Sequence, residues 1–479
     1  MAQIGLVGLA VMGANLALNI ESRGYSVAVY NRTYAATEKF MSIYGEGRKL
    51  EAAKTPEELI AKIDKPRTII MMIKAGAPVD ALIDTLIPLL DKGDTLIDGG
   101  NANFHDTVRR SKKMAEHGLM YIGMGVSGGE EGALHGPSLM PGGDYKAWEN
   151  VGQLLMDISA KAPNGEPCCA YLGTDGAGHF TKTVHNGIEY GDMELLCETY
   201  QFMRNATDMT CDQMGDVFAK WNEGMLGGYL TTITSEILKF KENGEALVPR
   251  ILDVAGQKGT GKWTVIEALN VGVPSTVVGE ALFSRFLTTK KAERVEASKI
   301  FDGPEAMENV DAAFVEKLGE ALLAAKIILY AQGCAILIDC TKEYGWKMHI
   351  PTIARLWRGG CIIRSNMLED IVEAFETNPD LPNMMIAPKF REILKKNIPS
   401  LREVVAEGAK RGIALPAMAS ALAYFDGYRC AKLPANLLQA QRDYFGAHTY
   451  LLEDDQESGP RHTNWTGEGG EISSGVYNV

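Results

Sequence analysis

The first third of the chain alternates short β-rich runs with helical patterns, and this alternation limits the folds that are open to it. The β-rich runs are residues 3–7, 26–30, 68–73, 95–98 and 120–124. Strands that alternate with helices form βαβ units on a parallel sheet. We therefore predict an N-terminal α/β domain with a doubly wound sheet over residues 1–176.

The β signal fades after a glycine-rich stretch at residues 173–178, and apolar residues then recur with a helical period as far as residue 430. This pattern predicts a large all-α domain over residues 177–433. Residues 434–479 hold few apolar side chains near their end, which predicts an irregular C-terminal tail without a core of its own.

The net charge and the cysteines indicate which binding partners and which cellular location to expect. The 48 Lys and Arg against 61 Asp and Glu give a formal charge of -13, which disfavours nucleic acid as a partner. The eight cysteines lack the spacing of a metal site and fit a reducing cytoplasm. Lys326 and Gln332 interrupt the apolar stretch at residues 322–338, so we expect a buried helix there rather than a membrane span, and no targeting segment.

A glycine-bounded loop follows the first predicted strand and opens the first predicted helix. Its residues are Gly8, Leu9, Ala10, Val11, Met12 and Gly13. In a Rossmann-type domain such a loop turns tightly and presents the free N–H groups of a helix N-terminus to the pyrophosphate of a dinucleotide. We therefore predict that this loop binds a dinucleotide cofactor.

The end of the second predicted strand distinguishes NAD from NADP. NAD-binding domains usually carry Asp or Glu there to bond a ribose hydroxyl, whereas this chain has Asn31, Arg32 and Thr33. The planar guanidinium of Arg32 matches a 2′-phosphate, and its two neighbours supply further donors. The predicted cofactor is NADP.

Two more loops close predicted strands at the same edge of the sheet. Their residues are Ile73, Lys74 and Ala75 after the third β-rich run and Asn101 after the fourth. Ligands of open α/β sheets bind at this carboxyl edge, so we expect all four to contact the cofactor. Asn101 can also face the substrate.

The predicted helix at residues 178–190 has one polar, ionisable face. At about 100° per residue, Lys182, His185, Asn186 and Glu189 fall within an arc of roughly 100°. His185 has no second ligand at metal spacing, so we predict a hydrogen-bonding role for it and no metal.

This helix resembles the catalytic helix of the 6-phosphogluconate dehydrogenase family, within the wider β-hydroxyacid dehydrogenase group. Three further motifs resemble those of the family and follow in its order: SGGEEGA at residues 127–133, KGTGKW at 258–263 and QRDYFGAH at 441–448. The resemblance extends along nearly the whole chain.

The resemblance implies oxidation at carbon 3 of 6-phosphogluconate, loss of carbon dioxide and release of ribulose 5-phosphate and NADPH, a step of the pentose phosphate pathway. Lys182 would act as base for the hydroxyl and then as acid for the carbonyl oxygen. Glu189 would protonate carbon 1 of the five-carbon enediol that remains. A base role near neutral pH requires the Lys182 pKa to fall by about 2.5 units from about 10.4, a cost of roughly 3.5 kcal/mol that burial can supply.

The same resemblance assigns the residues that bind the substrate. The acid end and the hydroxyls would contact Asn101, Ser127, Gly128, Gly129, His185 and Asn186. The phosphate would contact Tyr190, Lys258, Arg285, Arg442 and His448. The last two belong to the C-terminal region, which the resemblance implies is contributed in trans to the partner's site in a homodimer.

Two other functions stay open. A non-decarboxylating β-hydroxyacid dehydrogenase would share the fold and the lysine base but lack the phosphate cluster and the long C-terminal region. A catalytically inactive nucleotide-binding scaffold would keep Gly8 and Gly13 but lose Lys182 or Glu189, and both of these are present.

Overall fold

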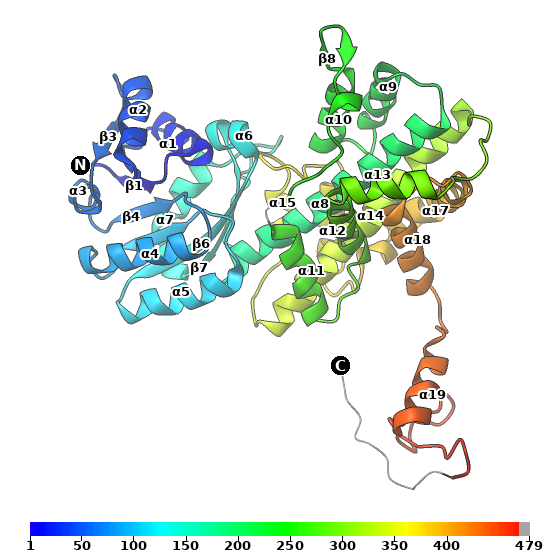
Figure 1. The fold of residues 1–479 in the computed structure, drawn as a ribbon. Coiled ribbons are helices and arrows are strands. Elements are labelled where there is room, and N and C mark those ends of the chain that lie inside the picture. Colours follow the sequence, from blue (N-terminus) through cyan, green and yellow to red (C-terminus); the bar gives the residue numbers. More distant parts are fainter. Residues whose placement is uncertain (258, 469–479) are drawn as a thin grey trace. The chain divides into compact units, whose positions relative to one another are not determined.

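The computed structural model describes residues 1–257 and 259–468 (Figure 1). The chain divides into two compact units, Met1–Leu422 and Ala423–Val479, with the boundary inside helix α18 (Pro416–Tyr428). The domain limits that the sequence suggests at residues 176 and 433 remain predictions.

A seven-stranded sheet forms the N-terminal part of the first unit. Its spatial order is β3-β2-β1-β4-β5-β6-β7; the first six strands along the chain are parallel, and β7 runs antiparallel to β6. The strands are β1 Ile4–Val7, β2 Val27–Tyr30, β3 Leu50–Ala53, β4 Thr68–Met71, β5 Thr95–Asp98, β6 Met120–Ser127 and β7 Ser138–Gly143. The chain reverses its direction of travel across the sheet between β1 and β4, which is where ligands bind in such sheets.

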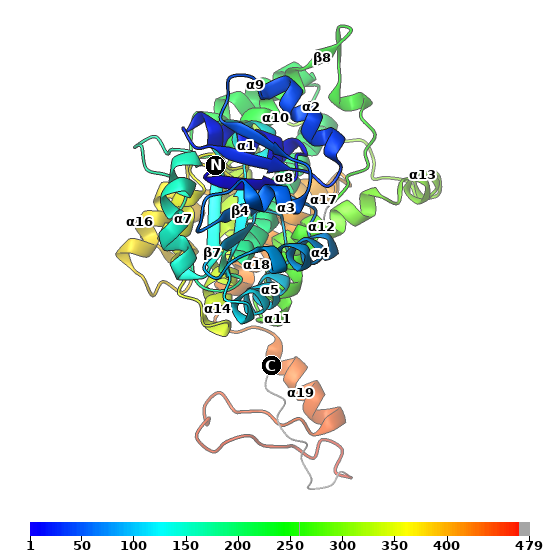
Figure 2. The same ribbon diagram turned by 90° about the vertical axis from the view of Figure 1, so that its left-hand side faces the viewer.

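Helices cover both faces of the sheet, as the two views of Figures 1 and 2 show. One apolar core joins the sheet to α1 (Val11–Ser22), α2 (Tyr34–Tyr44) and α7 (Tyr145–Ile158). A second core joins it to α3 (Pro56–Ala61), α4 (Ala77–Leu86) and α5 (Phe104–Glu116). The predicted doubly wound α/β domain is confirmed.

The sequence predicts five of these strands but neither β3 nor β7. Strand β3 has the sequence LEAA, without a β-branched or aromatic residue, and β7 contains Pro141 and two glycines. Both lie at edges of the sheet, where such residues are tolerated because fewer ladder hydrogen bonds are needed. Pairing with a neighbouring strand, rather than local propensity, makes these segments strands.

The rest of the first unit is largely helical, as predicted. Its elements are α6 Gly129–His135, α8 Ala177–Ala206, α9 Cys211–Asn222, α10 Tyr229–Lys239, the hairpin strands β8 Lys241–Glu242 and β9 Glu245–Ala246, α11 Thr260–Asn270, α12 Thr276–Thr288, α13 Lys291–Ile300, α14 Ala312–Glu343, α15 Ile350–Leu356, α16 Leu368–Thr377 and α17 Pro388–Lys410.

Helices α8 and α14 pack against each other at the centre of the helical part. Helix α8 begins against β6 and β7, so its first turns join the sheet to the helices. Among the described residues, α14 alone is long and apolar enough to cross a membrane, and 83% of its most apolar window is buried in the structure. Lys326 on α14 pairs with Asp192 on α8 at 3.0 Å, which neutralises two buried charges inside this core.

The described part of the second unit, as far as residue 468, is organised around one buried carboxylate rather than an apolar core. Residues for which the sequence predicts irregular chain form helix α19 (Ala435–Gly446), and Asp443 lies on it with no exposed surface. Its oxygens accept hydrogen bonds from the backbone of Thr449 and Thr463 and from the indole of Trp465, each at 2.9 Å. A polar centre of this kind leaves no apolar periodicity for sequence analysis to detect.

Candidate active site

A cavity of about 820 Å³ lies at the carboxyl edge of the sheet. Its lining includes most of the predicted cofactor residues, namely Ala10, Val11, Met12, Gly13, Ile73, Lys74, Ala75 and Asn101. Thr260 and Trp263 of α11 also line it, so the sheet and the helical part both contribute walls. The volume falls in the range of small-molecule and cofactor sites.

The glycine loop requires its glycines at both ends. Gly8 has a φ of +98°, a backbone angle that residues with a side chain rarely adopt. A Cβ on Gly13 would lie 1.9 Å from the Gly8 carbonyl oxygen. Helix α1 then begins at Val11 without a side-chain cap, so its first N–H groups are available to an anion. These features fit the pyrophosphate of a dinucleotide.

The end of β2 is tied to this loop through Asn31. Its side-chain oxygen accepts a hydrogen bond from the N–H of Leu9 at 3.1 Å, and its amide donates to the Thr33 carbonyl at 3.1 Å. Arg32 is exposed and forms no ion pair with the part of the chain that the structure describes. Asn31 therefore ties the segment that carries Arg32 to the glycine loop, and no described carboxylate pairs with this guanidinium.

The polar face of α8 brings three predicted residues into direct contact. The Lys182 side-chain nitrogen Nζ lies 2.6 Å from Asn186 Oδ1 and 3.2 Å from His185 Nδ1, and His185 Nδ1 lies 3.1 Å from the same amide oxygen. All three side chains are buried. The helical spacing that the sequence suggests is therefore realised as a compact hydrogen-bonded group.

His185 is held from its other side by residues distant in the sequence. Its Nε2 lies 3.0 Å from Ser127 Oγ, at the end of β6, and 2.9 Å from Cys361 Sγ. Burial, and then the charge of Lys182, lower the pKa of His185 well below its usual value, so the imidazole is neutral. A neutral ring that donates from Nδ1 to Asn186 accepts at Nε2 from the hydroxyl of Ser127.

Burial moves the two ionisable groups of α8 toward their neutral forms. It lowers the pKa of Lys182, while the carboxylate of Glu189 acts in the opposite direction. It raises the pKa of Glu189, opposed by the charges of Lys182 and Arg285. On one helix face, burial thus favours an amine that can accept a proton and a carboxyl that can donate one.

Tyr190 and Arg285 form the next part of the site. The Arg285 guanidinium carbon stacks 3.6 Å from the centre of the Tyr190 ring, and its Nη1 donates to the Gly256 carbonyl at 3.5 Å. Stacking of this kind holds the planar guanidinium while its remaining donors stay available to an anion. The predicted Lys258 lies outside the described residues.

Two predicted glycines make none of these side-chain contacts. Gly128 and Gly129 lie at the start of α6, and a Cβ on Gly128 would come within 2.7 Å of the Gly360 carbonyl oxygen. Arg442 and His448 belong to the second unit. There the Arg442 guanidinium donates to Gln439 Oε1 at 3.1 Å.

Sequence reasoning did not single out Cys361 or the wall residues Thr260 and Trp263. Cys361 follows two glycines in a connection between helices, and its neighbour in space, His185, lies 176 positions away. The glycine pair is the one local signal of a close approach. Thr260 and Trp263 belong to the KGTGKW motif, of which only Lys258 is expected to contact the substrate, whereas Thr260 and Trp263 line the cofactor cavity.

A polar bridge joins two helices that both line the cavity, α5 and α11. His105 on α5 lies 3.0 Å from Glu267 on α11, and the hydroxyl of Tyr344 donates to the same carboxylate at 2.9 Å. Asn103 and Asp106 on either side of His105 line the cavity. The bridge therefore fixes α11 against the sheet at the cofactor cavity.

Comparison with known proteins places this architecture in one family. Residues 3–173 match the model of the NAD binding domain of 6-phosphogluconate dehydrogenase, and residues 178–465 match that of the 6-phosphogluconate dehydrogenase C-terminal domain.

Relatives of known name match over their full length. A decarboxylating 6-phosphogluconate dehydrogenase of Schizosaccharomyces pombe is 49% identical over 100% of this chain and 99% of its own, and that of Rattus norvegicus is 48% identical over the same shares. A solved structure of Plasmodium falciparum 6-phosphogluconate dehydrogenase, studied in complex with its cofactor NADP+ and with its substrate 6-phosphogluconate, has a TM-score of 0.93 at 43% identity and covers 97% of this chain and 100% of its own. The chain belongs to the 6-phosphogluconate dehydrogenase family.

Proposed function

We propose that the protein is an NADP-dependent oxidoreductase that converts 6-phosphogluconate to ribulose 5-phosphate, carbon dioxide and NADPH. The observation that carries the proposal is the buried face of α8, where Lys182 has a lowered and Glu189 a raised pKa. The relatives named above are decarboxylating enzymes, and the Plasmodium structure binds both molecules. The reaction is a step of the pentose phosphate pathway.

NADP, when bound, accepts the hydride that leaves carbon 3. The glycine loop and the uncapped start of α1 would hold its pyrophosphate, and Arg32, with Thr33, its 2′-phosphate. The loops at residues 73–75 and 99–101 would cover its remaining face. Asn31 keeps the glycine loop beside Arg32.

The acid end of the substrate would lie against Ser127, Gly128 and Gly129, with His185 and Asn186 as hydrogen-bond partners of its oxygens. Neutral His185 and uncharged Asn186 can orient a carboxylate and hydroxyls without binding a cation there. Asn101 would contact both substrate and cofactor.

Lys182 and Glu189 would divide the proton transfers. Neutral Lys182 accepts the carbon 3 hydroxyl proton at Nζ as the hydride departs, and the ammonium then donates to the carbonyl oxygen while the carbon 1 to carbon 2 bond breaks and carbon dioxide leaves. The resulting enediol returns a hydroxyl proton to Lys182 and takes a proton from the Glu189 carboxyl at the former carbon 2, which becomes carbon 1 of ribulose 5-phosphate. Burial supports this scheme because it makes both neutral forms accessible.

The phosphate would be bound by Tyr190, Lys258 and Arg285, together with Arg442 and His448. The stack of Arg285 on Tyr190 supports this assignment, because it holds a guanidinium against the residue that follows Glu189 on α8.

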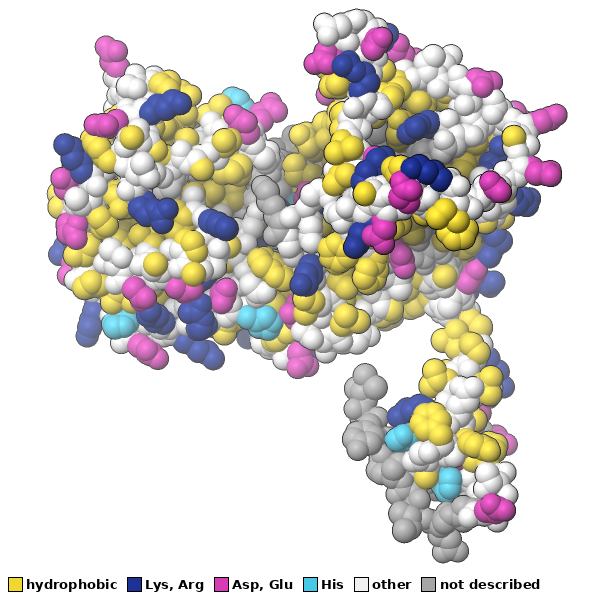
Figure 3. Space-filling model, in the orientation of Figure 1, with side chains coloured by type: hydrophobic (Ala, Val, Ile, Leu, Met, Phe, Trp, Pro, Cys, Tyr) yellow, Lys and Arg dark blue, Asp and Glu magenta, His cyan; other side chains and the backbone are white. Residues whose placement is uncertain are grey.

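We also propose a homodimer in which Arg442 and His448 serve the partner's site. Figure 3 shows apolar side chains over α11, α12 and α13, and exposed residues there include Leu269, Phe283, Leu287 and Ile300. A face of this kind is typical of a protein interface. The separate second unit, with Leu437, Leu438 and Phe445 exposed on α19, is suited to packing on another chain.

The dimer proposal can be tested by complementation. Lys182→Ala and Arg442→Ala chains are unfolded and refolded together, and heterodimers are confirmed by differential tags. If Arg442 acts in trans, each heterodimer has one intact site and activity returns on mixing. Confirmed heterodimers without activity would refute the shared site.

A cytoplasmic location completes the proposal. All eight cysteines are free thiols, including the adjacent Cys168 and Cys169, which fits a reducing compartment. Fractionation of cells that produce the protein tests this location.

One assay tests the activity and its alternatives. The purified protein is mixed with NADP and 6-phosphogluconate while NADPH and carbon dioxide are followed. Equal amounts of both products support the proposal. NADPH without carbon dioxide would indicate a non-decarboxylating dehydrogenase, and cofactor binding without either product an inactive scaffold.

A further inference from the structure

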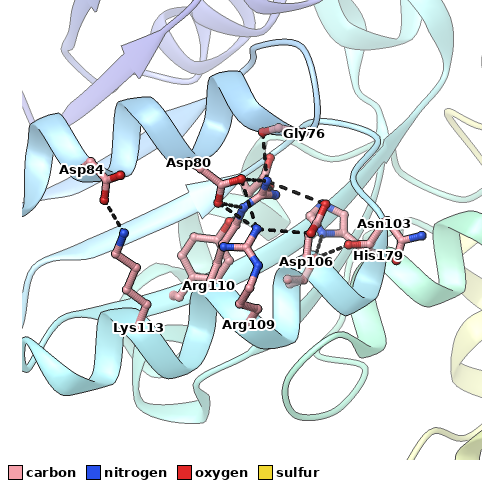
Figure 4. A network of polar contacts seen from close by, with 12 residues as sticks. Gly76, Asp80, Asp84, Asn103, Asp106, Arg109, Arg110, Lys113 and His179 are labelled. Carbon is pink, nitrogen blue, oxygen red and sulfur yellow. Dashed lines mark hydrogen bonds and ion pairs between the residues drawn. The ribbon is translucent and has the colours of Figure 1, made fainter.

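A buried arginine lies behind the cofactor cavity without taking part in the chemistry described above. Arg110 is on α5, its side chain has no exposed surface, and Figure 4 shows its guanidinium at the centre of a polar network. Because a buried guanidinium is costly unless its donors are satisfied, its partners indicate what it holds in place.

One set of contacts reaches the loop after β4. The guanidinium donates from Nη2 to the Gly76 carbonyl at 3.0 Å, and Gly76 lines the cavity immediately before α4. The same guanidinium also donates to both carboxylate oxygens of Asp80, in the first turn of α4, from Nε at 2.9 Å and from Nη2 at 3.0 Å. Arg110 therefore fixes both the end of this loop and the start of the helix that follows it.

The other set reaches the loop after β5. Nη1 donates to Asp98 Oδ2 at 3.4 Å, and the second oxygen of Asp98 accepts the N–H of Gly100 at 3.0 Å. The hydroxyl of Tyr121 donates to Asp98 at 3.1 Å. Gly99, Gly100 and Asn101 line the cavity, so the Asp98 carboxylate helps to fix one of its walls through Gly100.

The adjacent Arg109 provides a natural comparison. Its guanidinium also contacts Asp80, at 2.9 and 3.0 Å, but its other partner among the described residues is Asp106, at 3.2 Å. About half of its side chain is exposed, in contrast to Arg110. Arg109 thus shares one carboxylate with Arg110 but touches neither Gly76 nor Asp98.

We propose that Arg110 is a positioning residue for the cofactor: one guanidinium joins the two backbone loops, at residues 73–76 and 98–101, that line the NADP cavity. A lysine cannot replace it, because a single ammonium lacks the planar fork that reaches Gly76, Asp80 and Asp98 together. The inference rests on the proposed NADP dependence and adds a residue that acts on the cofactor through other groups.

The test compares Arg110→Lys with Arg109→Lys. The dissociation constant for NADP is measured by calorimetry, and thermal unfolding is followed with and without NADP. We expect Arg110→Lys to weaken NADP binding by about tenfold or more, because one or two hydrogen bonds between charged groups are lost. The NADP-induced rise in Tm should become smaller as well. Arg109→Lys should change NADP affinity by less than about twofold, the usual effect of an exposed ion pair.

A second variant covers the case in which Arg110→Lys fails to fold. Asp80→Asn removes the charge of the partly exposed carboxylate that the Arg110 guanidinium binds, so we again expect weaker NADP binding. The Michaelis constant for 6-phosphogluconate should stay nearly unchanged at saturating NADP. Wild-type NADP affinity in whichever of these variants folds, even with a lower Tm, would overturn the inference and leave Arg110 a stabilising residue only. Wild-type protein that does not bind NADP would instead overturn the proposed function.

Discussion

The cofactor cavity and the polar face of α8 are built in different ways. The cavity is lined in part by loops at the ends of parallel strands, and these loops contribute Gly13, Gly76, Gly99 and Gly100. The face of α8 consists of ionisable side chains that are buried and bonded to one another. Backbone donors act with fixed partial charges, whereas side chains depend on burial to set their protonation.

The difference indicates where each region is sensitive to mutation. Cofactor binding should depend on backbone geometry and on a few charges at its rim, and chemistry on the protonation of Lys182 and Glu189. Variants at the two regions should therefore separate binding from turnover, and the following four predictions examine that separation.

The largest effect is expected for Lys182→Met. Methionine has a similar length but no proton to exchange, so kcat should fall by about 10² to 10⁴, the usual contribution of an acid-base group. NADP affinity, measured by calorimetry, should stay within about twofold because Lys182 is not part of the cavity lining. Near-normal turnover would exclude Lys182 as the base.

Glu189→Gln should lower kcat by about 10²-fold and change its pH profile. In the proposed scheme, wild-type activity requires neutral Lys182 and protonated Glu189, so it should rise and then fall with pH. The glutamine variant should lose the falling limb and keep a rising one that reflects Lys182, below the ordinary lysine pKa of 10.5 because burial lowers the pKa of that residue. Glu194→Gln is the matched control, since burial also raises the pKa of Glu194 on the same helix. A falling limb that persists in Glu189→Gln would contradict the assignment.

At the rim of the cavity, Arg32→Glu should weaken NADP binding by at least about 30-fold, because an attractive charge becomes a repulsive one beside the 2′-phosphate. NAD affinity should fall little or improve, since a carboxylate can bond the ribose hydroxyls. Lys39→Glu, the same charge change at an exposed position of α2, controls for net charge. Equal losses for both cofactors would mean that Arg32 has only a structural role.

The smallest effect is expected for Cys361→Ala. Burial raises the pKa of this thiol to about 12, so it is protonated at neutral pH and contributes at most a weak hydrogen bond to His185. The Michaelis constant for 6-phosphogluconate should rise by less than about tenfold, because Ser127 still bonds the same nitrogen. Ser127→Ala should cost more, and the opposite order would give Cys361 the larger role in orienting His185.

The amino-acid sequence alone was sufficient to predict those features that depend on local geometry. The glycine loop, the absence of an acidic residue after β2 and the polar face of α8 all follow from spacing along one strand, turn or helix, and the predicted fold was confirmed for the same reason. Tertiary structure decided the rest. It made strands of two segments with weak propensity, brought Cys361 to His185 and joined two loops through Arg110. It also set the direction of the Lys182 and Glu189 pKa shifts, because burial is produced by elements far apart in the sequence and no local pattern encodes it.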